Sequence, residues 1–214
     1  MRASLIAVVL PCAISLASCT PSRSDTDSSS SHARSGPLRQ LNSSPLQGYR
    51  IRLTIQDAPG PLLLTDARAQ YDVVNEVQCG KQRRTGGLYR MVSNEVLPLR
   101  KVDDVTYEGV VYLDQILDGD YYGYGACKWE LAEVRAGLSA TGSTGETRFA
   151  PYFSSESVQS LDSETRYFWK ARYPRSDVDD FTSFGETDRT RIKSELQNQL
   201  FTMTWSATRM EVSP

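Results

Sequence analysis

Histidine is nearly absent from this chain of 214 residues: the only one, His32, lies in a serine-rich segment near the N-terminus. A Ser-His-Asp triad, a Cys-His pair and an HExxH zinc site each need a histidine inside a folded domain. The chain also has no CxxC, no lysine three residues after a serine, and no GxSxG, since GLSAT at 137–141 fails at its last position. These absences argue against the common nucleophilic and zinc-dependent hydrolases.

Charge of one sign is not in excess either, because 26 acidic residues stand against 24 Lys and Arg, for a formal net charge of −2. This balance offers no basic surface for nucleic acid. Paired carboxylates could support glycoside hydrolysis, with Asp114, Asp120, Glu130 and Glu133 as candidates. So many acids form such pairs on a solvated surface by chance, and we predict a protein that is not an enzyme and needs no cofactor or metal.

Long apolar runs are missing as well. The run from Leu5 to Leu16 is much shorter than the ~20 residues that a helix needs to cross a bilayer. It follows Arg2, and a short apolar stretch behind a positive charge at the N-terminus is typical of an export signal.

The segment closes on four residues that resemble the lipobox of bacterial lipoprotein precursors. They are Leu16, Ala17, Ser18 and Cys19. The resemblance implies a signal peptide over residues 1–18 and attachment of lipid to the Cys19 thiol. Several acyl chains hold a protein to a membrane far more firmly than one chain does. Thr20, rather than Asp, then implies transport to the outer membrane, with the protein on its periplasmic face.

Two cysteines remain once Cys12 leaves with the signal peptide and Cys19 carries lipid. In an oxidising compartment we expect this pair, Cys79 and Cys127, to form a disulfide. In the loop-entropy picture a bridge across so long a loop stabilises by about 3–4 kcal/mol. Trp129 follows on the same strand face and is expected to shield the bridge. The alternative is a pair of buried free thiols.

Residues 19–47 join the expected lipid to the rest of the chain. After Cys19 they are dominated by Ser, Pro, Arg and Asp and hold almost no large apolar side chain. Such a segment cannot bury enough surface to offset its ordering entropy. We therefore predict a disordered tether that ends where the folded domain begins, at Gly48.

Residues 48–214 carry the periodicity of β-structure. GYRIRLTIQ (48–56) alternates apolar and polar side chains without a fault, which is typical of a half-buried strand. Patterning and composition favour further strands at 67–79, 105–113, 126–134, 147–153 and 164–173. We predict a mainly β fold: a single antiparallel β-sandwich or barrel-like domain with one disulfide.

The C-terminal part changes its period. TDRTRIKSELQNQL (187–200) places Ile192, Leu196 and Leu200 four residues apart and predicts a short helix. Alternation from Phe201 onward predicts a final strand. The basic GKQRRTGG (80–87) lacks the residue order of a phosphate-binding loop and is expected to be a hairpin loop.

The stretch DQILDGDYYGYG (114–125) has the composition of a binding loop, because tyrosine gives rigid contact area and glycine interrupts the strand. The predicted partner-binding residues are Asp118, Asp120, Tyr121, Tyr122 and Tyr124. Two alternatives stay open: the tyrosines pack only on the end of the sandwich, or the aromatic residues take a saccharide. A Ca²⁺ site at Asp114, Asp118 and Asp120 is disfavoured, because their spacing is not that of an EF-hand.

Residues 121–130, YYGYGACKWE, resemble part of the small β-sandwich lipoproteins of proteobacteria, some of which are immunity proteins against secreted toxins. The resemblance implies that the domain binds an unknown periplasmic or secreted protein, such as an antibacterial effector. We therefore expect a membrane-anchored envelope lipoprotein that binds a protein partner. The alternative is a structural or assembly lipoprotein of the envelope, which would bury a broad sheet face rather than a protruding loop.

Overall fold

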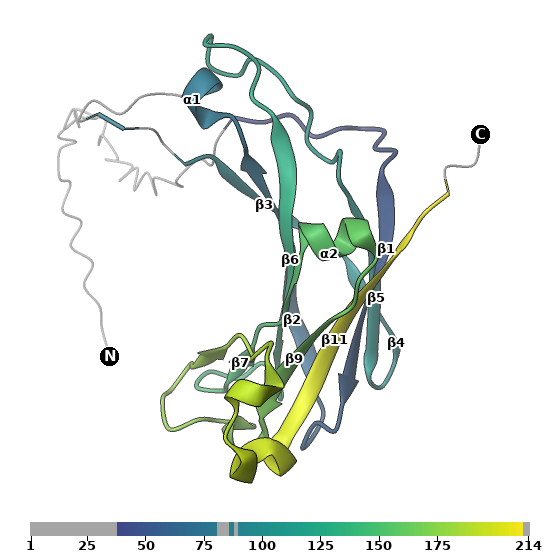
Figure 1. The fold of residues 1–214 in the computed structure, drawn as a ribbon, viewed down its shortest axis with the longest axis vertical. Helices are drawn as coiled ribbons and strands as arrows, with labels where there is room; N and C mark the ends of the chain where they lie inside the picture. Colours follow the sequence, from purple (N-terminus) through teal and green to yellow (C-terminus); the bar gives the residue numbers. More distant parts are fainter. Residues whose placement is uncertain (1–37, 81–85, 88–89, 212–214) are drawn as a thin grey trace, which may run out of the picture. The chain divides into compact units, whose positions relative to one another are not determined.

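Two packed β-sheets make up the part of the chain that the computed structural model describes, residues 38–80, 86–87 and 90–211 (Figure 1). The mainly β prediction is confirmed, and the fold is a sandwich rather than a closed barrel. Lipid on Cys19, the signal peptide and most of the basic loop at 80–87 lie outside the described residues.

Five antiparallel strands form the first sheet, in the order β4-β5-β1-β11-β9. They are β1 (Gly48–Gln56), β4 (Leu99–Asp103), β5 (Thr106–Tyr112), β9 (Glu164–Trp169) and β11 (Leu200–Arg209). The second sheet has the order β10-β7-β6-β2-β3, with β8 also paired to β6. Its strands are β2 (Leu63–Val73), β3 (Val92–Val96), β6 (Trp129–Ser139), β7 (Arg148–Phe149), β8 (Tyr152–Ser154) and β10 (Thr182–Ser183).

The alternation of β1 and β11 determines which face of the first sheet is buried. Leu53 lies opposite Trp205 in the antiparallel register, and both side chains are fully buried. Rings from both sheets complete the core: Phe149 of the second sheet meets Phe201 of the first at a centroid distance of 5.1 Å. Edge-to-face rings of this kind stabilise beyond the area that they bury.

The predicted disulfide between Cys79 and Cys127 is confirmed, with a Cα–Cα distance of 5.2 Å. Both cysteines are fully buried, and Trp129 belongs to the same buried cluster. The strand predicted at 67–79 is wrong at its end, because β2 stops at Val73. Cys79 instead ends the short helix α1 (Glu76–Cys79).

The short helix predicted at 187–200 is present only as 3₁₀ turns, not as one continuous α-helix. The chain forms two short 3₁₀ segments, η2 (Arg189–Arg191) and η3 (Ser194–Gln199), before it enters β11 directly. Backbone N–H groups of Ile192 and Leu196 donate to the carbonyls of Arg189 and Lys193, at 3.1 and 3.0 Å, and close the 3₁₀ turns. The side-chain amide of Gln197 also donates to the carbonyls of Arg189 and Ile192, at 3.4 and 3.3 Å. The other helical segments are α2 (Ser155–Ser160) and η1 (Lys170–Arg172).

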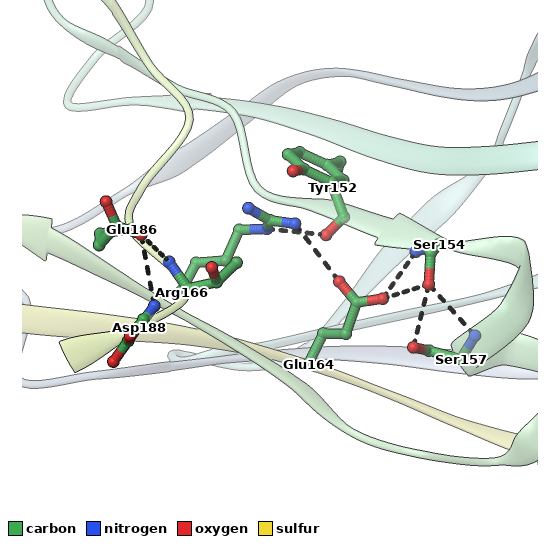
Figure 2. Close-up of polar contacts among 8 residues, drawn as sticks. Tyr152, Ser154, Ser157, Glu164, Arg166, Glu186 and Asp188 are labelled. Carbon is green, nitrogen blue, oxygen red and sulfur yellow. Dashed lines mark hydrogen bonds and ion pairs between the residues drawn. The ribbon is translucent and has the colours of Figure 1, made fainter. Parts of the chain in front are cut away.

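A buried polar cluster joins the sheets where β9 passes β8 (Figure 2). Glu164 accepts hydrogen bonds from the backbone N–H and the hydroxyl of Ser154, while Arg166 Nε donates to the Tyr152 carbonyl at 3.1 Å. The Arg166 guanidinium also lies 3.2 Å from the centroid of the Tyr152 ring and pairs with Glu164. Since Arg166 is only 3% exposed, its charge depends on these partners.

Residues 38–47, which were expected to belong to a structureless tether, instead lie against the domain, and we call them the strap. Leu41 forms a β-bridge with Ile116. The carboxylate of Asp114 accepts hydrogen bonds from the backbone N–H groups of Leu46 and Gln47, at 2.9 and 3.0 Å. The strap cannot build a core of its own, and contacts with Asp114 and Ile116 order it instead.

Candidate functional site

Two segments meet at the end of the sandwich that carries α1, and we call them together the disulfide tip: residues 74–79 and 118–128 (Figure 1). The Cys79–Cys127 bridge joins them covalently. Gly119 and Cys127 exchange both backbone hydrogen bonds, with N···O distances of 3.2 and 2.9 Å. The loop is therefore tied at its base as well as to α1.

Asn75 fixes the start of α1 to the other segment. Its side-chain oxygen accepts from the Lys128 N–H at 2.8 Å, and its side-chain amide donates to the Ala126 carbonyl at 2.9 Å. The backbone N–H of Val74 also donates to the Lys128 carbonyl at 3.0 Å. Because the Asn75 side chain both donates to and accepts from the backbone of residues 126–128, it holds the start of α1 in one geometry against that segment.

Asp120 shapes the outer turn of the loop. One carboxylate oxygen accepts from the N–H groups of Gly123 and Tyr124, at 2.7 and 3.1 Å. Burial acts to raise the pKa of Asp120, but hydrogen bonds from the surrounding backbone N–H groups outweigh it and lower that pKa. Gly123 has φ +79°, a conformation that favours glycine. Asp118 accepts from the backbone N–H of Trp129 at 2.9 Å. Both aspartates therefore stabilise the conformation of the loop.

Two of the three predicted binding tyrosines face the strap. The Tyr122 hydroxyl accepts from the N–H of Leu38 at 2.9 Å, and the Tyr121 hydroxyl accepts from the N–H of Gln40 at 3.1 Å. Both rings are half-buried and pack against the core. Their surfaces are thus largely used within the chain.

Tyr124 has a different environment, with 63% of its surface exposed. On the adjoining segment, Val77 is 82% exposed and Val74 is 55% exposed. The sequence predicted Tyr124 as a site residue but missed both valines, because it assigned them to a strand. The missed signal was Asn75-Glu76, which interrupts the alternation of the preceding strand.

Of the acidic residues singled out from the sequence, Asp114, Asp118 and Glu130 line one pocket in the described part of the chain. No group of three metal-ligating side chains is found there. Asp114, Asp118 and Asp120 each accept backbone N–H groups, and Glu133 pairs with Arg135. The disulfide tip presents exposed apolar side chains, Val74 and Val77, and the exposed Tyr124 on a braced backbone.

Among the described residues, no helix is both long and apolar enough to cross a membrane. Comparisons with protein-family models, with curated proteins and with solved structures give no match to this chain.

Proposed function

We propose that this protein is an envelope lipoprotein, held on the periplasmic face of the outer membrane by lipid on Cys19, that captures a protein partner with its disulfide tip. The observation that carries the proposal is the exposure of Val74, Val77 and Tyr124 on this tip. Exposed apolar and aromatic side chains that lie close together on a protein surface are typical of a binding site.

The bracing of the tip supports this role, because binding is weakened by the entropy of ordering a loop. Here the disulfide, Asn75 and Asp120 order the backbone in advance. Tyr121 and Tyr122 contribute indirectly, since they position the loop against the strap. Tyr124 is then the aromatic anchor that enters the partner.

We propose a secreted antibacterial effector as the partner, with the protein acting as its immunity factor. Support comes from the resemblance of residues 121–130 to immunity-type lipoproteins, and these residues include Tyr124. A periplasmic position behind the outer membrane is where an incoming toxin would be met.

The binding proposal is tested by photo-crosslinking of the full chain in the native cells. A photoreactive amino acid at Tyr124 should give one discrete crosslinked product that weakens when Val77 is changed to Ser. The same probe at Val178 is the control, since Val178 is 61% exposed on the loop before β10, outside the tip. Equal crosslinking from both positions, or none from Tyr124, contradicts the proposed site.

The immunity role is tested by growth. Cells that lack the protein should be killed by contact with unmodified siblings and rescued by the unmodified chain or by Val178→Ser. The double variant Val77→Ser/Tyr124→Ala should fail to rescue while accumulating to the same level. Survival of the deletion strain contradicts the immunity role but leaves the crosslinking result to decide the binding role.

A further inference from the structure

A second surface lies at the other end of the sandwich, where η2 and η3 fold over the outer face of β9 (Figure 1). It is a cleft of about 400 Å³, which we call the aromatic cleft. Tyr167 and Trp169 of β9 form its floor: they point away from the core, because Phe168 between them is buried. The volume lies within the ~300–1,000 Å³ of small-molecule sites.

Two segments wall the cleft. The crossing segment 181–186 leaves the second sheet and pairs with β9, where Tyr167 and Glu186 exchange backbone hydrogen bonds of 2.8 and 2.9 Å. Ile192 and Leu196 form the opposite wall. The four-residue apolar spacing that predicted a helix thus lines a cleft instead.

The rings in the cleft are accessible. Trp169 is 37% exposed and Phe184 is 47% exposed. The indole N–H of Trp169 donates to the Gln199 side-chain oxygen at 3.3 Å, which sets the orientation of the ring. An oriented, exposed indole presents a flat surface on which the C–H face of a sugar ring can pack.

Two charged groups in the cleft have capacity left for a ligand. The guanidinium of Arg172 lies 4.5 Å from the Phe181 ring centroid and 5.8 Å from that of Trp169. Arg166 and Arg191 have carboxylate partners, whereas Arg172 has none among the described residues. One carboxylate oxygen of Glu186 accepts from the backbone N–H groups of Thr187 and Asp188 and pairs with Arg191. Within the described residues, the second carboxylate oxygen of Glu186 accepts no hydrogen bond.

We propose that the aromatic cleft binds a saccharide that carries a carboxylate group. Arg172 donates to the carboxylate in the bidentate geometry that guanidinium favours. The second oxygen of Glu186 accepts from a hydroxyl, and Trp169 packs on the ring. A purely apolar ligand would bury the Arg172 charge without a partner, and a simple anion would leave the rings unused. The site is separate from the disulfide tip and does not depend on its role.

The test uses the full chain in detergent micelles, titrated with three acidic saccharides: oligogalacturonate, N-acetylmuramic acid and sialyllactose. The methyl ester of each is the matched ligand that lacks only the charge. Trp129 and Trp205 are buried, so a change in indole fluorescence reports on Trp169. At least one acid should bind saturably, and its ester should bind at least about tenfold more weakly.

Variants locate the site. Arg172→Gln should remove the difference between acid and ester, and Trp169→Phe should remove the fluorescence response. Arg175→Gln, a nearby arginine that donates to the Thr144 carbonyl, should change neither. The proposal is overturned if none of the acids binds, if acid and ester bind equally, or if a tetraglutamate peptide binds as tightly as the best saccharide. The comparison of acid with ester decides the matter on the unaltered chain even where a variant fails to fold.

Discussion

Arg39 of the strap forms a two-bond ion pair with Glu95, an acidic residue of β3 that lies 56 positions further along the chain. The Nη2–Oε2 distance is 3.1 Å, and Ser93 donates a further hydrogen bond to the same carboxylate. Glu95 faces inward beside Ala69 and Tyr71, and its side chain is 14% exposed. The strap thus supplies the charge that an inward-facing carboxylate of the second sheet needs.

This pair predicts a pH dependence of stability. Burial acts to raise the pKa of Glu95, but its hydrogen bonds with Arg39 and Ser93 outweigh burial and lower that pKa below its ordinary value of 4.5. A lowered folded-state pKa contributes stability that is present above pH ~4.5 and is lost as the pH falls through the folded value.

We therefore expect Arg39→Gln to lower the free energy of unfolding by about 1 kcal/mol at pH 7. The difference from the unaltered chain should shrink in acid. Urea titrations at pH 7 and pH 3 measure it, with Arg209→Gln, an exposed arginine of β11, as the control. An effect of equal size at both values would show that Arg39 acts by packing rather than by charge.

The Glu164–Arg166 cluster predicts strong coupling between its members. Removing one partner of a buried ion pair leaves an uncompensated charge, so Arg166→Met should destabilise by about 3–5 kcal/mol. Glu164→Leu alone should be comparably harmful. The double variant should recover much of the lost stability, because it leaves no unpaired charge between β9 and β8.

A double-mutant cycle in urea measures this coupling. Thr165→Ala/Thr204→Ala, which removes a hydroxyl contact of 2.9 Å in the adjoining strands, is a control outside the cluster. Additive losses for Glu164 and Arg166 would mean that the two side chains stabilise the fold independently.

Removal of the disulfide should destabilise the domain by about 3–4 kcal/mol, because the bridge closes a loop between residues 48 apart. Cys79→Ala/Cys127→Ala, compared with the unaltered chain with and without reductant, gives this difference. The same double variant should also weaken crosslinking from Tyr124, since the tip would lose its brace. Unchanged stability after reduction would mean that the hydrogen bonds of Asn75 and Asp120, rather than the disulfide, order the tip.

Gly185 allows the crossing segment to reach β9, and its substitution should show this. At φ +75°, a Cβ at this position would lie 2.8 Å from the Phe168 ring and 2.9 Å from Cβ of Arg166. Gly142 is the matched control, because its φ is +86° but a Cβ there would meet nothing closer than 3.9 Å.

Both alanine variants carry the left-handed backbone strain of about 1–2 kcal/mol. Gly185→Ala should lose about 1–3 kcal/mol more through overpacking. Thermal unfolding of the two variants side by side measures the difference. Equal losses would mean that the crossing segment can move away from β9 without harm.

Local periodicity was sufficient for much of the fold. Alternation in 48–56 and after Phe201 predicted β1 and β11 correctly, because a strand with one buried face must place apolar residues at every second position. It was only partly correct at 187–200, where three apolar residues spaced by four predicted one helix and the chain forms two short 3₁₀ segments. There Ile192 and Leu196 line a cleft together with Tyr167 and Trp169 of β9, and such a distant neighbour is not visible in the local pattern.

Composition placed the predicted binding tyrosines in one loop, but it did not indicate which of them are exposed. Tyr121, Tyr122 and Tyr124 lie within four residues of one another and look equivalent in the sequence. The strap covers the first two and leaves the third exposed. The exposed valines of the disulfide tip come from a segment almost 50 residues before Tyr124, and the disulfide joins that segment to the loop of Tyr124.

By itself, the amino-acid sequence determined the β-rich class, the cysteine pair and the alternation that buries one face of each long strand, since all three depend on residue type and short spacing. Only the tertiary structure decided that the strap joins the domain, which tyrosine faces solvent, and that residues 167–200 assemble an aromatic cleft. These outcomes depend on which strands become neighbours, and hydrogen bonds or ion pairs between residues tens of positions apart have no signature in local sequence.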